Sequence, residues 1–306
     1  MDYTLFKDAV LDRLKEKVAE GKEVNVKTIL KNNDLELDAL TIDDEVTDLV
    51  PTLYLNYLYD EYVNGSTIDE IVDEIIFVSD NYSMHKSIDY EALENYETAK
   101  QHLACKLINR EKNQKLLKTL PFKPFLDLAI VVYYLLEVEE GDFSTVMINY
   151  ECLKKWKISE EKLIEEAMEN TKELLGEYIS PLSSVLWDIY NQREGSCSLE
   201  DEMMELMVKE EGQMPMFVVS NKPRVNGAVN MLNLRFMKKL AEAVNADLYI
   251  IPSTVHEIIL VPAKPDVSRE ELDQIIHSIN KEEIKPQDVL SDHSYFYSRE
   301  LNKITL

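Results

Sequence analysis

Residues 127–138 (DLAIVVYYLLEV) constrain the fold of this chain more than any other segment. Nine successive apolar residues, 128–136, are far too few to cross a membrane as a helix. They are rich in the β-branched and aromatic residues typical of strands, and an unbroken apolar run needs cover on both faces. The sequence therefore predicts a central strand at 127–138, which Gly141 and Asp142 turn into an antiparallel partner at 144–150.

Apolar residues recur at helical spacing in several other segments. These patterns predict helices over 3–19, over 50–62 with Pro51 at its start, after Thr67, after Ser159, over 234–244 and after Ser268. Thr67 with Glu70, and Ser268 with Glu271, form capping boxes. The last helix carries an apolar stripe of Leu272, Ile275, Ile276 and Ile279. Two further helical stretches are expected near 181–192 and 198–209.

Shorter apolar segments predict the remaining strands. They are a strand or hairpin at 24–41, strands at 216–220, 248–251 and 258–261, and a short edge strand at 295–297. The order favours an α+β fold with a mixed, largely antiparallel sheet flanked by helices and a helical, acidic N-terminal part. We expect a region 1–100 and a region 101–306. No Gly/Ser-rich or Pro-rich linker separates them, so they should pack together as two regions or as one domain.

Residues 34–99 form an acidic block. They contain eighteen Asp and Glu and a single lysine, Lys86, hence a net charge of −17 out of −25 for the whole chain. Such a block attracts cations and basic partners, although a charge run also serves as a solvated face. The candidate interface residues are Asp60, Glu61, Asp69, Asp73 and Glu74. Tyrosines 54, 57, 59 and 62 share one expected helix, and tyrosine suits protein interfaces as well as cores.

Two segments that follow predicted strands hold short polar, basic and histidine side chains. If the loop 220–228 and the turn 252–257 lie at one edge of one sheet, they share a cleft. The candidate pocket residues are Asn221, Arg224, Asn226, Ser253, Thr254, His256 and Glu257. Basic groups and Asn beside a helix start can bind an anion. The alternative is that these side chains only satisfy the backbone of a capped loop and a turn.

No catalytic residue can be assigned from a motif. Ser253 and His256 suggest a hydrolase, but the G-x-S-x-G elbow is missing and the two residues could meet only in a tight turn. His85, His102, His277 and His293 lack metal-ligand spacing, and His256 and Glu257 diverge on a strand. The seven glycines form no phosphate cradle. We expect neither a metal nor a cofactor.

The composition also bounds the cellular setting. The first residues are charged throughout and predict no signal peptide. The three cysteines, Cys105, Cys152 and Cys197, form no C-x-x-C pair, which indicates free thiols in a reducing cytoplasm. A net charge of −25 argues against direct nucleic-acid binding, and no segment is long enough to span a membrane.

Three segments carry a resemblance to a known family. VPTLYLNYLYDEYVNG (50–65), LINREKNQKLLKTLPFKPFLDLAIVVYYLL (107–136) and IIPSTVHEIILVP (250–262) resemble a family of bacterial proteins, known from anaerobic gut Firmicutes, that is described as a domain of unknown function. The resemblance implies a cytoplasmic bacterial protein. It implies no activity, cofactor or catalytic residue.

Three functions are compatible with these features. The first is a cytoplasmic protein that binds another protein, for example a basic one, through its acidic, Tyr-rich face. The second is a hydrolase that uses the Ser253/His256 turn. The third is an acidic mimic that blocks the nucleic-acid-binding surface of a partner. The absence of a catalytic motif and the charge of the block favour the first.

Overall fold

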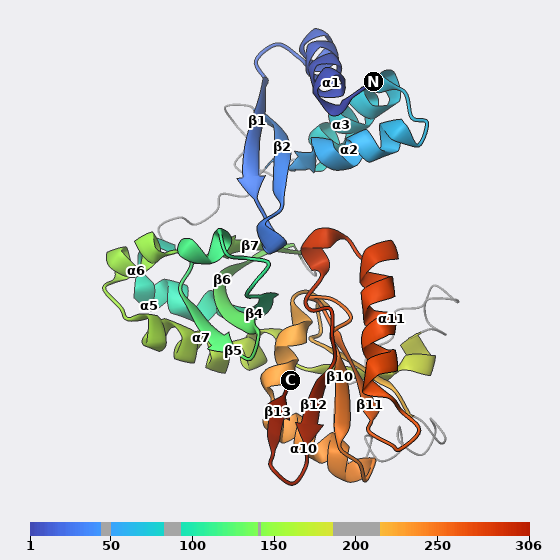
Figure 1. Ribbon diagram of the computed structural model, residues 1–306. Helices are drawn as coiled ribbons and strands as arrows, with labels where there is room; N and C mark the ends of the chain where they lie inside the picture. Colours follow the sequence, from blue (N-terminus) through green and yellow to red (C-terminus); the bar gives the residue numbers. More distant parts are fainter. Residues whose placement is uncertain (44–49, 83–92, 140–141, 186–214) are drawn as a thin grey trace. The chain divides into compact units, whose positions relative to one another are not determined.

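The computed structural model (Figure 1) describes residues 1–43, 50–82, 93–139, 142–185 and 215–306. The chain forms two compact units, Met1–Tyr90 and Glu91–Leu306. Both combine helices with antiparallel sheets, so the predicted α+β class is confirmed. The boundary falls at residue 90 rather than near 100, because Tyr96 and Ala99 pack in the core of the second unit. How the two regions pack together stays a prediction.

In the residues that the structure describes, the first unit contains a three-stranded antiparallel sheet, in the order β1-β2-β3, and three α-helices. Its elements are α1 (Tyr3–Lys17), β1 (Glu23–Leu30), β2 (Glu36–Asp43), β3 (Leu53–Tyr54), α2 (Leu55–Val63) and α3 (Ile68–Tyr82). The β1–β2 hairpin predicted at 24–41 is confirmed. The helices gather on one side of it (Figure 1), where α1 contacts β1 and α2 contacts β2.

The core of this unit is aliphatic and aromatic. Phe6, Val10 and Leu14 of α1 are buried against residues of α2 and α3. The rings of Tyr59 and Tyr62 lie 5.2 and 5.4 Å from that of Phe6, so part of the Tyr-rich helix supports the core instead of an interface. Thr67 and Glu70 form the predicted capping box, with Oε2 of Glu70 accepting the Thr67 N–H at 2.8 Å.

The helix expected over 50–62 begins later than its sequence pattern indicates. Leu53 and Tyr54 pair with Leu40 and Ala39 as strand β3, and α2 starts only at Leu55. Ladder hydrogen bonds to β2 therefore hold the segment after Pro51 extended, although Pro is favoured in a first helical turn.

The second unit opens with a sheet built around β6. Its elements are α5 (Tyr96–Ala99), β4 (Leu103–Asn109), β5 (Phe122–Phe125), β6 (Leu128–Glu139), β7 (Asp142–Met147), α6 (Tyr150–Trp156) and α7 (Glu160–Leu175). β6 pairs antiparallel with β4, β5 and β7, which confirms the predicted central strand. Its partner β7 ends at Met147, before the expected residue 150, because Asn149 caps α6 and Tyr150 is its first residue.

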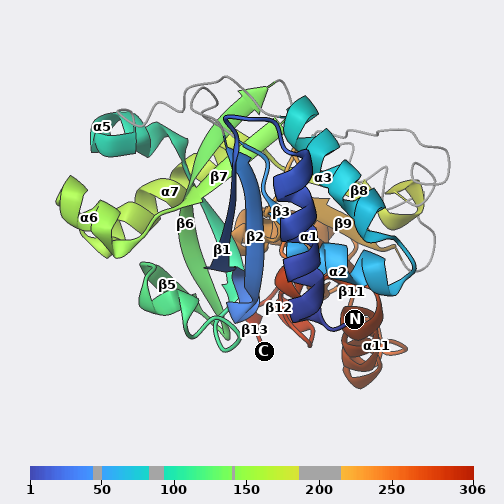
Figure 2. The same ribbon diagram turned by 90° about the horizontal axis from the view of Figure 1, so that it is seen from above.

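Both faces of β6 are covered, as its unbroken apolar run requires. Leu128, Ile130 and Val132 belong to the main core, to which α7 contributes Leu163 and Ile164. Ala129 and Val131 face a smaller cluster with Ile108, Leu117 and Leu120. Figure 2 shows α7 beside β6. Ser159 caps α7 as predicted, since its side chain accepts the N–H of Lys162.

A second antiparallel sheet has the order β13-β12-β10-β11-β9-β8. Its strands are β8 (Tyr178–Pro181), β9 (Phe217–Ser220), β10 (Leu248–Ile251), β11 (Ile258–Pro262), β12 (Tyr295–Ser298) and β13 (Lys303–Thr305). The strands predicted at 216–220, 248–251 and 258–261 are confirmed. The segment 295–297 is a strand but not an edge strand, because β13 pairs with its outer side.

Helices α10 (Leu234–Ala243) and α11 (Arg269–Glu282) confirm the remaining predictions, and Ser268 caps α11 by accepting the N–H of Glu271. The apolar stripe of α11 is less buried than its spacing indicates. Ile276 is buried, whereas Ile275 and Ile279 are 55% and 46% exposed. Of the helices expected near 181–192 and 198–209, residues 182–185 are helical after Pro181, the last residue of β8, and the rest lie outside the described ranges.

Candidate functional site

The loop 220–228 and the turn 252–257 lie in direct contact. β9 and β11 are antiparallel neighbours, with Val219 opposite Ile258, so the chain leaving β9 and the chain entering β11 meet at one edge of the sheet. The Ser220 hydroxyl donates to the His256 carbonyl at 2.7 Å, and the Asn226 N–H donates to Nδ1 of His256 at 3.1 Å. Whether a ligand binds at this junction stays a prediction.

Gly227 occupies the point of closest approach. A Cβ atom there would lie 2.1 Å from Oγ of Ser220 and 2.6 Å from both the Asn221 nitrogen and the His256 oxygen. Only glycine fits this space, and this requirement was not apparent from the sequence. The preceding Asn226 has a φ of 57°, a left-handed conformation that asparagine tolerates better than most residues.

The side chains of the loop are engaged in holding it. Asn221 is 1% exposed; its amide donates to the Val225 carbonyl at 2.7 Å and its Oδ1 accepts the Val225 N–H. Arg224 donates to the Tyr178 hydroxyl at 2.6 Å, and its guanidinium lies 4.5 Å from the ring centroid. Asn226 also bonds the hydroxyl of Tyr133, whose pKa burial raises to about 12. An anion at this loop would compete with these contacts.

The turn 252–257 is likewise held by its own polar groups. The Thr254 hydroxyl accepts the His256 N–H at 3.0 Å, and the Ser253 hydroxyl donates to Glu257 at 3.3 Å. Because Nδ1 of His256 accepts the Asn226 N–H, the ring proton sits on Nε2, which lies 3.5 Å from Oδ1 of Asp288. Nucleophilic catalysis needs a serine hydroxyl donating to the histidine. The contacts differ from that arrangement, so we do not propose the hydrolase.

A cavity of about 180 Å³ lies next to this junction. It is formed by α7 and by the segment from Gly227 to Asn233, and its lining residues are Met168, Thr171, Lys172, Glu177, Val229, Asn230, Leu232 and Asn233. The residues predicted for the pocket are not among them. Lys172 and Asn233 both contact the Glu177 carboxylate, so the polar groups of this cavity satisfy one another.

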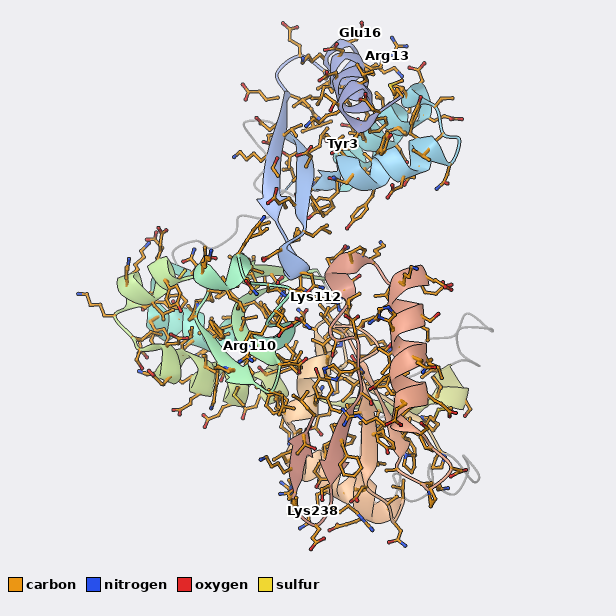
Figure 3. All side chains as sticks on the ribbon, viewed as in Figure 1. Tyr3, Arg13, Glu16, Arg110, Lys112 and Lys238 are labelled. Atoms are coloured by element: carbon orange, nitrogen blue, oxygen red, sulfur yellow. The ribbon has the colours of Figure 1, made fainter. Side chains whose placement is uncertain are left out.

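The acidic residues predicted for an interface are all exposed, but they differ in their partners. Asp69 lies 2.7 Å from Nε of Arg13, and Asp73 lies 2.6 Å from Nζ of Lys17. Farther along α3, Asp80 pairs with Lys22 at 2.7 Å. Figure 3 shows Arg13 and Glu16 together on α1. The basic residues that precede the acidic block therefore neutralise one row of its carboxylates.

Glu61 and Glu74, unlike Asp69 and Asp73, contact each other instead of a basic side chain. Their carboxyl groups, on α2 and α3, lie close enough to share a hydrogen bond, and the pKa of Glu61 is raised by partial burial and by the charge of Glu74. In the described residues of the first unit, no lysine or arginine forms an ion pair with either of them. Two carboxyl groups therefore face each other, and no ion pair within these described residues compensates their charge.

Sequence reasoning missed a polar cluster around Asp127, in the turn that leads from β5 into β6. Its carboxylate accepts a hydrogen bond from the Tyr295 hydroxyl at 2.9 Å and lies 3.0 Å from Nε2 of His293. Nearby, Lys112 reaches Asp292 at 2.6 Å and Arg269 donates to the Ser294 carbonyl at 2.8 Å. Figure 3 labels Lys112 where the segment after β4 meets the C-terminal part of the same unit.

The geometry of this cluster favours a charged histidine. Nδ1 of His293 faces the Ser294 carbonyl and Nε2 faces a carboxylate, and both groups can only accept. The hydrogen bond to Asp127 raises the pKa of His293, against the opposing effect of burial. Burial acts to raise the pKa of Asp127, but hydrogen bonds from His293 and Tyr295 lower it overall. The pair therefore joins the two sheets of the second unit, as an ion pair when His293 is protonated.

This contact should make stability depend on pH. Because the pKa of His293 is raised, its contribution to the stability of the folded state is complete below pH 6.5. That contribution is lost as the pH rises through the pKa of the folded state. Because the pKa of Asp127 is lowered, its contribution to the stability of the folded state is present above pH 3.8 and is lost as the pH falls through the pKa of the folded state. We expect His293→Gln to cost about 1–2 kcal/mol at pH near 5.5 and clearly less near pH 9, measured by thermal unfolding. Exposed His102→Gln is the control; equal losses at both pH values would contradict this assignment.

Within the described ranges, His, Cys, Asp and Glu form no group of three that could hold a metal ion. In the same ranges, no helix is long and apolar enough to cross a bilayer. Cys105 is a buried free thiol, and burial raises its pKa to about 12, which makes it a poor nucleophile. Cys152 is also free, and Cys197 lies outside the described residues.

These features define an α+β protein of two antiparallel-sheet units, whose polar clusters largely satisfy themselves. The chain belongs to the family of unknown function DUF5688, whose model matches residues 3–299. This match confirms the resemblance to a family of unknown function. No curated protein and no solved structure matches the chain.

Proposed function

We propose that this protein acts in a bacterial cytoplasm by binding a basic partner protein through the face formed by α2 and α3. The observation that carries the proposal is the contact between Glu61 and Glu74, two carboxyl groups that form no ion pair with a described residue of the first unit. A lysine or arginine from a partner would relieve their repulsion, and this relief adds to the attraction between opposite charges.

The same face offers an apolar contact. Phe77 lies one turn after Glu74 on α3 and is 60% exposed, and Val63 at the end of α2 is 65% exposed. Apolar side chains beside a charged rim are typical of protein interfaces. Asp60 lies next to Glu61 and is exposed, so we narrow the predicted interface to Asp60, Glu61, Glu74 and Phe77. Asp69 and Asp73 are already paired with α1.

Two observations support the setting and the kind of partner. The free thiols of Cys105 and Cys152 suit a reducing compartment, and the family resemblance supports a bacterial one. Arg13, Lys17 and Lys22 neutralise a row of aspartates that a mimic of a nucleic-acid backbone would leave charged. The structure therefore favours a localised protein contact over the polyanion mimic.

The test compares which basic proteins the immobilised full chain retains from a lysate at low and high salt, quantified by mass spectrometry. Wild type should retain a basic protein whose binding weakens at high salt. The double variant Glu61→Lys/Glu74→Lys should bind that protein about tenfold more weakly or worse, and Phe77→Ser should lose affinity without losing the salt dependence.

Glu169→Lys, at an exposed position of α7 in the second unit, is the matched control, because it makes the same kind of charge reversal on the other unit. It should leave binding unchanged, and circular dichroism should show that every variant is folded. Retention of the same proteins by wild type and by the double variant, at either salt concentration, would rule out the α2–α3 face.

A further inference from the structure

A groove lies between strand β5 and helix α7 in the second unit. Its volume is about 230 Å³, and its lining residues are Phe122, Lys123, Pro124, Glu160, Glu161, Ile164 and Glu165. Phe122, Pro124 and Ile164 form an apolar floor and wall, and Ile164 is 2% exposed. The groove is independent of the α2–α3 face, which lies in the other unit.

The edge of β5 beside this groove cannot accept another strand. The Phe122 N–H donates to Oε1 of Glu160 at 2.8 Å and therefore points away from β6. Alternate residues of a strand direct their backbone groups to the same side, so position 124 also faces outward, and proline has no N–H to offer. The segment Phe122–Phe125 is therefore a blocked edge strand. A partner must enter this groove with a side chain.

The carboxylates at the groove differ in what they already bind. Glu160 accepts the Phe122 N–H and also bonds the Tyr150 hydroxyl. Glu161 and Glu165 lie one helical turn apart on α7 and are exposed. In the part of the chain that the structure describes, neither forms an ion pair. The lining of the groove thus combines apolar side chains with two carboxylates that form no ion pair with a described residue.

We propose that this groove receives an arginine side chain of a partner protein. Its methylene stem would pack against Phe122, Pro124 and Ile164, as the stems of basic side chains do on apolar surfaces. Its planar guanidinium would lie between Glu161 and Glu165, where several N–H donors in a fixed fork can serve two carboxylates. The volume suits one such side chain, and the net charge of −25 disfavours a second copy of this chain as the partner.

The test uses the full chain, isotope-labelled for NMR, and a capped Gly-Arg-Gly peptide. Binding on the order of millimolar is expected for a single side chain. The chemical-shift changes on addition of the peptide should be largest at the amides of Phe122, Lys123, Ile164 and Glu165. The matched peptide with citrulline, which keeps the shape and loses the charge, should give no such shifts. A lysine peptide should bind more weakly; equal binding would overturn the assignment to arginine.

Four variants separate this groove from general charge attraction. Glu161→Gln/Glu165→Gln should weaken peptide binding by about fivefold or more, whereas Glu169→Gln, one turn beyond the groove on the same helix, should not change it. Lys123→Ala should tighten binding, because it removes a like charge from the lining. Glu61→Lys/Glu74→Lys should leave peptide binding intact, which distinguishes this site from the α2–α3 face. Shifts that survive Glu161→Gln/Glu165→Gln, or no shifts at saturating peptide, would overturn the proposal.

Discussion

Replacing Gly227 by alanine should destabilise the second unit by about 3 kcal/mol or more. The new methyl group would lie 2.1 Å from the Ser220 hydroxyl and 2.6 Å from backbone atoms of Asn221 and His256. A hydroxyl can rotate away, but the two backbone atoms belong to strand ends held in one sheet. Differential scanning calorimetry should show the transition of this unit lowered by roughly 6–12 °C.

Two comparisons sharpen this prediction. At Gly21 no atom lies within 4 Å of an added Cβ, although its φ is +94°, so Gly21→Ala should cost only the backbone strain of about 1–2 kcal/mol. Ser220→Ala in the Gly227→Ala background should recover part of the loss by removing the closest contact. If Gly227→Ala melts like wild type, the junction between the loop 220–228 and the turn 252–257 is looser than its hydrogen bonds indicate.

Replacing Val131 by aspartate should be similarly severe. Val131 lies in the middle of β6, opposite Lys106 of β4 and Phe122 of β5, and it is 0% exposed. A carboxylate there would be buried among the apolar residues of its cluster, and even with Lys106 on the neighbouring strand its desolvation costs several kcal/mol. The loss in free energy of unfolding, measured by chemical denaturation, should become smaller as the pH falls, because burial favours the protonated form of the new aspartate.

Val131→Thr is the matched control, since it keeps the branched shape and adds only a hydroxyl. Its cost should be clearly smaller than that of Val131→Asp and should not vary with pH. An unchanged stability of Val131→Asp would mean that the residue reaches solvent and that β6 is not covered on both faces.

The sequence predicts local structure well where one signal decides it. The apolar run at 128–136 requires a two-sided strand, and the capping residues Thr67, Ser159 and Ser268 set the starts of their helices. Tertiary pairing overrides such signals at Leu53 and Tyr54, which join β2 as a strand. β12 is internal only because β13, a three-residue strand with little pattern of its own, pairs with it.

The candidate sites were harder to predict because they depend on contacts between distant residues. The loop 220–228 and the turn 252–257 follow and precede neighbouring strands, so their proximity could be expected from antiparallel pairing. Asp127 and His293 are 166 residues apart in the sequence and adjoin strands of two different sheets. Neither residue belongs to a motif that predicts its contact with the other. Likewise, the spacing of Asp69 and Asp73 does not show that Arg13 and Lys17 neutralise them.

The two sheets of the second unit should form at different times. Strands β4 to β7 occupy residues 103–147 and connect through short segments, so their contacts are local and their folding should be fast. The six-stranded sheet instead places β12, residues 295–298, between β10 and β13. During synthesis, β10 and β11 leave the ribosome before β12. One side of β10 therefore stays unpaired until β12 has been synthesised and pairs with it. We therefore expect nascent chains that stop before residue 295 to hold a folded β4–β7 sheet and a second sheet with an open edge, a form that recruits chaperones and aggregates more readily than the finished protein.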